Sequence, residues 1–340
     1  MICDEEMKKR RRNHFDVTDR VRISHVVDVR QACASLLERI YPNVDLRPVD
    51  MAFDMFARLY SGTLPGYVGC DTWYHDAQHS LDCTLATTRL LHGYESSVVE
   101  SERLGARRGI LGVIIALFHD AGYIRRTDDK ARNGAEYTLT HVHRSGEFLA
   151  SFLPMVGFSA ETGLTRQLVH FTGFEVALDR IQVSDPKDRI LGFMIGTADI
   201  LAQTSDRCYL EKCRDYLYRE FEICGLAGAL RNGRPKPLYT SPEALLHGTP
   251  EFTRKLWAER MDGYFQGVYR YMDAYFGGGN PYMEQIAEHI NHIAKAGRGR
   301  RARQLNRRPR VIDAAEIREQ LGLKGRDTQH ESRISTRVAA

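Results

Sequence analysis

Apolar residues recur every three or four positions along most of the chain, which is the spacing of amphipathic helices. In the segment 21–40, for example, Leu36, Leu37 and Ile40 follow this spacing up to the Pro42 break. The same pattern predicts helices over 50–60, 74–91, 109–120, 138–153, 161–180, 187–205, 209–224, 249–276 and 282–296. Alternating, turn-bounded strand patterns are nearly absent. We therefore predict an all-α protein, a compact multi-helix bundle.

Breaks in this pattern suggest the domain organisation. Residues 1–20 are basic and lack helical spacing, so we expect a poorly ordered N-terminal segment. The helical pattern then covers 21–296, with a Gly- and Pro-rich loop over 225–248. Residues 297–340 are predicted to form a basic, largely disordered C-terminal tail. From Lys295 to Arg310 there are eight Lys or Arg residues and no acid, so the tail could contact nucleic acid or another acidic partner.

Composition places the chain among soluble globular proteins. Of its 340 residues, 43% are hydrophobic and 27% charged, and the net charge is +4. No apolar run is long enough to cross a bilayer, and the basic N-terminus lacks the apolar stretch of a secretory signal. Seven scattered cysteines without a CxxC pair argue against a disulfide framework. We predict a cytoplasmic protein without a membrane span.

The segment Gly109–Tyr123 suggests where the chemistry lies. Its long apolar stretch ends in His119 and Asp120, so two metal-binding side chains are expected at the last turn of a buried helix. Burying an imidazole and a carboxylate is costly unless hydrogen bonds, a counter-charge or a metal compensates. An acid in another apolar helix, Asp199, is expected to be buried in the same way.

Two further histidines add to this candidate centre. His75 and His79 are four positions apart, so on a helix they share one face and can point at one site. His119 could bind one metal while the adjacent Asp120 bridges two. Nitrogen and oxygen ligands without a thiolate suit Zn, Mg or Mn, with Fe also possible. We therefore predict a shared metal centre in the core of the bundle, holding two divalent ions.

Three motifs resemble those of a known family. The order His, His-Asp, Asp is that of the HD-domain metal-dependent phosphohydrolase superfamily. The local sequences are most similar to the class I 3',5'-cyclic nucleotide phosphodiesterase catalytic domains. Tyr74-His75-Asp76-Ala77-Gln78-His79 resembles their Tyr-His-Asn-x-x-His motif except at Asp76, Leu117-Phe118-His119-Asp120 resembles the second motif, and the segment 189–200 resembles the helix that holds the last aspartate.

The resemblance implies roles for these residues. His79, His119, Asp120 and Asp199 would hold the first metal, and Asp120 would also contact the second. His75 would be the general acid: a metal-bridging hydroxide attacks phosphorus, and a cationic imidazole protonates the departing alkoxide. Asp76 beside it could raise the proton affinity of that imidazole. The expected function is then hydrolysis of a cyclic nucleotide or related nucleotide phosphoester by a catalytic domain over 21–296.

The chain also departs from the phosphodiesterase pattern. After His119-Asp120 it continues with Ala-Gly-Tyr instead of Asp-His, and only Gln266 and Gln285 are candidates for the purine-binding glutamine of that family. The extra residues His141, His143 and His170 lie where other HD proteins have additional metal ligands. If they complete a six-ligand set, a di-iron HD-type oxygenase is the alternative. A nucleic-acid-binding protein with a relic metal site is a third possibility.

Overall fold

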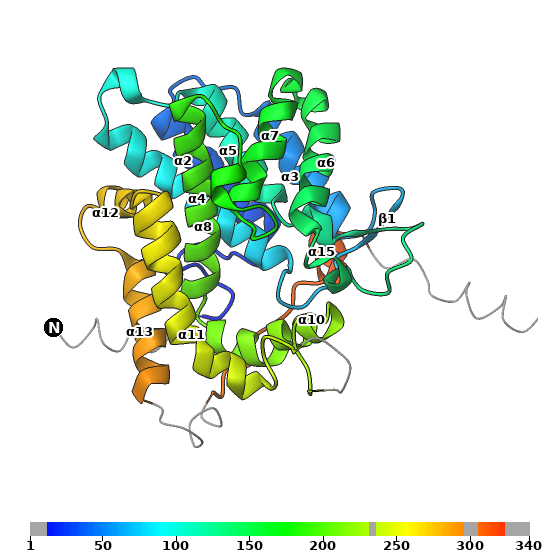
Figure 1. Cartoon of the computed structure of the whole chain (residues 1–340). Coiled ribbons are helices and arrows are strands. Elements are labelled where there is room, and N and C mark those ends of the chain that lie inside the picture. The colour runs from blue at the N-terminus through cyan, green and yellow to red at the C-terminus, as the bar shows by residue number, and fades with distance from the viewer. Residues whose placement is uncertain (1–11, 231–235, 296–304, 324–340) are drawn as a thin grey trace, which may run out of the picture.

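The structure is a computed structural model that describes residues 12–230, 236–295 and 305–323 (Figure 1). It is mostly helical, which confirms the predicted fold class at the level of a compact all-α bundle. The central helix is α4 (Ala77–Ser97), and almost all of its residues are buried. It packs against α5 (Ala106–Phe118) and α8 (Pro186–Ser205). The candidate ligands His119 and Asp120 directly follow α5, and Asp199 lies within α8.

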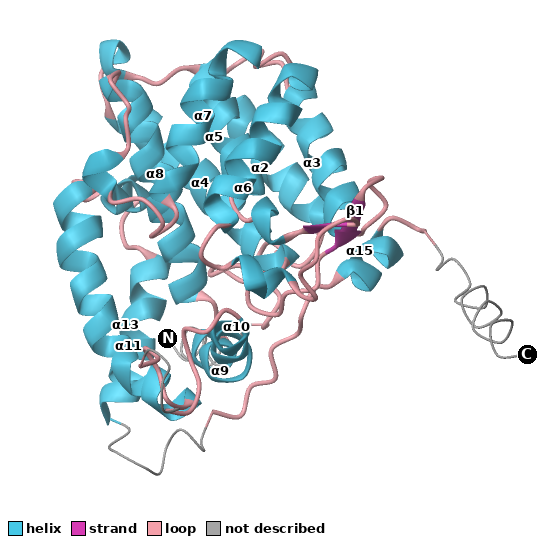
Figure 2. Cartoon of the chain, turned by 45° about the vertical axis from the view of Figure 1, so that its right-hand side comes forward, coloured by secondary structure: helices cyan, strands magenta, loops and turns pink. Residues whose placement is uncertain are grey.

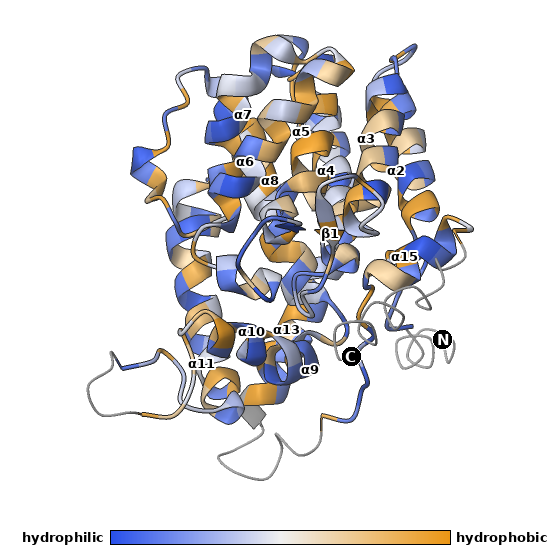
Figure 3. Cartoon of the chain, turned by 90° about the vertical axis from the view of Figure 1, so that its right-hand side faces the viewer, coloured by the Kyte–Doolittle hydropathy of each residue, from blue (hydrophilic) through white to orange (hydrophobic). Residues whose placement is uncertain are grey.

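Helix α5 is apolar on all sides and is buried from Gly109 to its end, as its sequence predicts (orange in Figure 3). Gly112 lets this helix approach α8 closely, because a Cβ atom at that position would lie only 2.6 Å from the Leu191 side chain. The close packing of α5 and α8 brings the end of one helix next to the middle of the other.

Other helices surround these three on the outside. They are α2 (Val26–Ile40), α3 (Arg47–Tyr60), α6 (His141–Phe152), α7 (Thr162–Leu168), α9 (Tyr209–Lys212), α10 (Tyr218–Ile223), α11 (Pro242–Leu256), α12 (Tyr271–Phe276), α13 (Pro281–Lys295) and α15 (Ala314–Gln320). The two strands β1 (Tyr67–Gly69) and β2 (Arg125–Arg126) form a short antiparallel pair.

Three predicted segments differ from the structure. The helix expected over 249–276 is interrupted: α11 ends at Leu256, a π-helical stretch follows over Trp257–Tyr264, and a 3-10 turn, Val268–Arg270, precedes α12. The helix expected over 161–180 ends as α7 at Leu168 and continues only as a short 3-10 turn, Val169–Phe171. The loop expected over 225–248 is shorter, because Ser241 caps α11 and Pro242 starts it. The segment 209–224 is helical as predicted but contains a π-helical stretch, Cys213–Leu217.

The N-terminal boundary also differs from the prediction. We expected residues 1–20 to be disordered, but residues 12–20 pack against the bundle. Asp16 is fully buried, and its side chain forms an ion pair of 2.5 Å with Arg89 of α4. Burial alone would raise the pKa of Asp16, but Arg89 and the hydrogen bonds from Thr18 and Val21 together outweigh this effect and lower the pKa. The folded domain therefore begins before residue 21, while residues 1–11 lie outside the described residues.

The C-terminal segment differs in the same way. Within the expected disordered tail, residues 305–323 lie against the bundle, and α15 packs beside α3 (Figure 2). Ile312 and Ile317 are fully buried, and the Ile312 N–H donates a 2.9 Å hydrogen bond to Asp76 Oδ2. The domain thus extends past residue 296. The rest of the basic tail, 296–304 and 324–340, lies outside the described residues, so its predicted contact with nucleic acid stays a prediction.

None of the described helices is both long enough and apolar enough to cross a membrane.

The docking of the C-terminal segment can be tested by its effect on stability. Replacing the fully buried Ile312 with Ala should lower the free energy of unfolding by about 2–5 kcal/mol, because it removes buried apolar volume. Denaturant unfolding measures this change. Val99→Ala, at a side chain that is 64% exposed, is the control and should change stability by less than about 0.5 kcal/mol. Equal effects of the two substitutions would show that this segment is not docked.

Candidate metal centre

The start of α4 is fixed by Asp76. Its carboxylate caps the helix: Oδ1 accepts a 3.1 Å hydrogen bond from the His79 backbone N–H. The other oxygen binds Ile312, so both oxygens are occupied by backbone groups. We expected Asp76 to raise the proton affinity of His75, but the structure gives it this capping role instead. The cap holds His79 in the first turn of α4.

The end of α5 presents the second pair of candidate ligands. His119 follows directly after Phe118, the last residue of α5, and Asp120 comes next. His119 Nδ1 lies 2.8 Å from the Ala116 carbonyl oxygen. Because a carbonyl can only accept, Nδ1 must carry the proton and Nε2 is the nitrogen left for a metal.

The structure brings the four predicted ligands together. His79 Nε2 lies 3.2 Å from His119 Nε2, 3.4 Å from Asp120 Oδ2 and 3.1 Å from Asp199 Oδ1. His119 Nε2 lies 3.4 Å from Asp120 Oδ2 and 3.7 Å from Asp199 Oδ1. Ligand atoms about 2.1 Å from one ion are separated by about 3.0–3.4 Å in octahedral or tetrahedral geometry. The spacing of His79, His119 and Asp120 therefore fits a shared ion, and Asp199 lies beside this group, 3.1 Å from His79.

Electrostatics also fit a bound cation. His79, His119 and Asp120 are all buried, and Asp120 Oδ2 has no hydrogen-bond partner among the described residues. Burial alone would lower the pKa of His119, but Asp120 and Cys83 together outweigh this effect and raise the pKa well above its usual value. A divalent ion would bind the carboxylate oxygen that lacks a hydrogen bond and replace the proton on the imidazole. This buried group could thus hold a metal ion.

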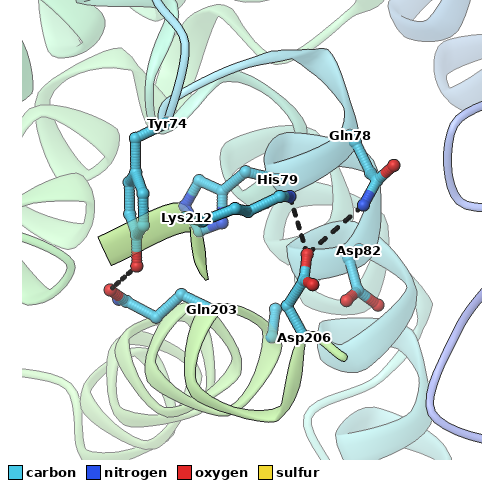
Figure 4. A pocket seen from close by; sticks show the side chains of 8 residues that line it. Tyr74, Gln78, His79, Asp82, Gln203, Asp206 and Lys212 are labelled. Atoms are coloured by element: carbon cyan, nitrogen blue, oxygen red, sulfur yellow. Dashed lines mark hydrogen bonds and ion pairs between the residues drawn. The ribbon is translucent and has the colours of Figure 1, made fainter. Parts of the chain in front are cut away.

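A polar layer beside the centre orients Asp199. Gln203, one turn further along α8, donates through Nε2 to Asp199 Oδ1 at 3.3 Å and accepts from the Tyr74 hydroxyl at 3.3 Å. Figure 4 shows Tyr74 and Gln203 next to His79. On the other side of His79, Lys212 forms a buried ion pair of 2.7 Å with Asp206. These contacts restrict the rotamers of the side chains around the ligands.

His75 lies next to the four-ligand group but has a separate partner. Its Nδ1 is 2.5 Å from Oε2 of Glu220, a fully buried side chain in α10. The other Glu220 oxygen accepts hydrogen bonds of 2.7 Å from the backbone N–H groups of Trp73 and Tyr74. Burial alone would lower the pKa of His75, but the carboxylates of Glu220, Asp120 and Asp199 together outweigh it, so the pKa is raised. Glu220 was not among the site residues predicted from the sequence.

Of the three additional histidines, only His141 adjoins the centre. Its Nε2 lies 3.6 Å from Asp120 Oδ1, the carboxylate oxygen opposite the one that faces His79 and His119. Burial lowers the pKa of His141 to about 4, so this imidazole is neutral at physiological pH, as a metal ligand must be. Neither His143 nor His170 is among the described residues that line the cavity.

The centre opens into a cavity of about 470 Å³. One end contains His75, the four predicted ligands and His141. The other end is mostly apolar, and its side chains are Leu139, Phe174, Leu217, Phe221, Leu226, Leu238, Tyr239, Leu245 and Phe252. Neither Gln266 nor Gln285, the two candidate purine-binding residues, is among the described lining residues. Gln203 is the one amide side chain in that described lining.

No protein-family model, no curated protein sequence and no solved structure matches the chain. The resemblance to the HD phosphohydrolases therefore rests on the three short motifs, and membership of that superfamily remains a prediction.

The ligand set predicts which histidine substitution removes bound metal. His79→Ala should lower the affinity for Zn²⁺ or Mn²⁺ by at least about tenfold, because even partners of ligands contribute that much. Elemental analysis after loading and gel filtration measures the metal per chain. His143→Ala is the matched control, since His143 is exposed and outside the described cavity lining. If both variants keep the wild-type metal content, the proposed ligand set is wrong.

Proposed function

We propose that the protein is a metal-dependent phosphohydrolase that cleaves a phosphoester, most simply a phosphodiester. The observation behind this proposal is the placement of an imidazole paired with a buried carboxylate, His75 and Glu220, on the same cavity as the four-ligand group. A phosphoryl group bound at the ligands would then have a proton donor beside it.

In this proposal the first ion is held by His79, His119, Asp120 and Asp199. Asp120 Oδ1 and His141 Nε2 face each other at 3.6 Å and would contribute to a second site. Two divalent ions bound in this way would polarise the phosphoryl oxygens, lower the pKa of an attacking water and neutralise developing charge. The role of the protein ligands is to fix these positions in a buried environment.

His75 supplies the proton. Because Nδ1 is bound to Glu220, Nε2 is the nitrogen available to the substrate. The P–O bond to the leaving group breaks as the Nε2 proton moves to the departing oxygen, which leaves as an alcohol. Glu220 stabilises the imidazolium form before this step and keeps the ring oriented during it. The resemblance favours a nucleotide phosphoester, so cyclic nucleotides belong in the first substrate screen.

The oxygenase alternative has less support. It required two or more additional histidines at the centre, and only His141 among the three lies next to Asp120. The third alternative depends on the basic tail, most of which lies outside the described residues. We therefore retain hydrolysis as the proposed function.

Removing His75 tests the role of the proton donor. His75→Ala should reduce the rate for esters of poor leaving groups by about 10²- to 10⁴-fold, the usual contribution of a general acid. The loss should be much smaller for a p-nitrophenyl ester, because that leaving group needs no proton. Steady-state rates with both ester types, on protein of verified metal content, measure the difference.

The same assay includes outcomes that count against the proposal. If metal-loaded wild-type protein turns over no cyclic nucleotide, linear nucleotide or simple phosphodiester, hydrolysis is wrong. If His75→Ala loses its metal, or if the good leaving group rescues nothing, His75 is not the general acid.

Glu220 predicts a shift in pH dependence. The carboxylate raises the pKa of His75, so the protonated acid persists to higher pH in the wild-type protein. Glu220→Gln removes this charge, and the His75 pKa should fall. The high-pH limb of the kcat/KM profile should therefore move to lower pH. A matched control is Glu147→Gln, at an exposed acid paired with Arg166. An unchanged Glu220→Gln profile would contradict the coupling.

A further inference from the structure

We propose that the substrate is a phosphoester with a single phosphoryl group and an apolar aryl or alkyl organic group, which binds at the apolar end of the cavity. This inference rests on the proposed hydrolysis, because the metal centre fixes where the phosphoryl group lies. It differs from the resemblance in the organic group of the substrate, because the resemblance points to a nucleoside.

The shape and chemistry of the cavity support an apolar ligand. A volume of about 470 Å³ is in the range of pockets that enclose whole small molecules, about 300–1,000 Å³. The phosphoryl group needs only the end at His79 and His119. The side chains that line the remaining space include Leu217 from the π-helical stretch, Phe221 from α10 and Leu245 from α11. An organic group placed there would exchange water for apolar contacts.

Charge disfavours a nucleoside diphosphate or triphosphate. No Lys or Arg is among the described lining residues, so within these residues a second phosphate would find no cationic side chain. Glu175, a lining acid whose Oε1 lies 3.6 Å from His141 Nδ1, accepts from the backbone N–H groups of Val142 and His143 at 2.7 and 3.1 Å. Its negative charge would repel additional phosphates.

Hydrogen bonding to a nucleobase is also poorly provided for. The one lining amide among the described residues, Gln203, uses its nitrogen for Asp199 and its oxygen for Tyr74. A base edge that binds Gln203 would have to share this amide with both contacts, using its second N–H hydrogen and the second lone pair of its oxygen. An apolar group makes no such demand.

The rim of the cavity gives a second, independent observation. Four large apolar side chains of the lining are strongly exposed to solvent: Leu139 at 59%, Phe174 at 67%, Leu238 at 70% and Phe252 at 41%. Phe174 and Phe252 face each other with ring centroids 6.4 Å apart. Exposed apolar residues that gather at one opening mark a binding site more often than scattered ones do. A long or aromatic organic group would cover this rim.

A series of p-nitrophenyl phosphodiesters with methyl, hexyl, phenyl or 5'-thymidyl as the second group tests the proposal. All share one leaving group, so differences report binding of the second group. With the full-length, Mn²⁺-loaded protein, kcat/KM should rise roughly two- to fourfold per methylene and favour hexyl and phenyl over thymidyl. A flat series, or preference for the thymidyl ester, overturns this inference but leaves hydrolysis intact. No turnover of any member also overturns this inference, and it overturns the proposed hydrolysis as well if the cyclic and linear nucleotides are not turned over either.

Substitutions at the rim separate specific binding from general hydrophobicity. Leu238→Ser and Phe252→Ser should each lower the ratio of hexyl to methyl kcat/KM by about threefold or more, because each removes apolar contact area. Val99→Ser is the control, since Val99 is also exposed, at 64%, but lies outside the described lining, and its ratio should equal that of the wild type. Unchanged ratios in both rim variants would contradict the assigned apolar end.

Discussion

The arrangement of the site depends on the burial of two imidazoles and two carboxylates where α4, α5 and α8 meet. Each group loses favourable hydration in this position. The ligand atoms lie 3.1–3.7 Å apart, so their contacts with one another offset only part of this loss. A divalent cation would offset this cost directly. A metal bound here would therefore account for the presence of His79, His119, Asp120 and Asp199 in an otherwise apolar core.

Segments distant in sequence position the groups around this centre. Asp76 joins the first turn of α4 to Ile312 in the C-terminal segment, and Glu220 joins His75 to α10. The same region of the chain, 209–252, supplies both the partner of the proposed proton donor and much of the apolar cavity wall. Proton transfer and recognition of the organic group would thus depend on one part of the fold.

Much of the site could be predicted from sequence because its signals are local. The apolar run before His119 correctly predicts its burial. The four-residue spacing predicts that His75 and His79 share one helix face, but α4 begins at Ala77, so His75 lies in the bend before the helix and only His79 is on it. Glu220 gave no such signal, since an acid in an amphipathic helix is usually exposed, and its pairing is a contact over 145 positions. The docking of 305–323 also lacked a local signal. The segment is mostly polar and packs against the bundle through a few apolar side chains, such as Ile312 and Ile317.

X-ray absorption spectroscopy of the Zn²⁺-loaded protein tests the central claim most directly. Cys83 lies close enough to His119 to affect its pKa, so a sulfur ligand is a real alternative to the proposed nitrogen and oxygen set. The account predicts a first shell of N and O atoms at about 2.0–2.2 Å with imidazole scattering and no sulfur. A sulfur shell at about 2.3 Å, or a fully hydrated ion without imidazole, would contradict it.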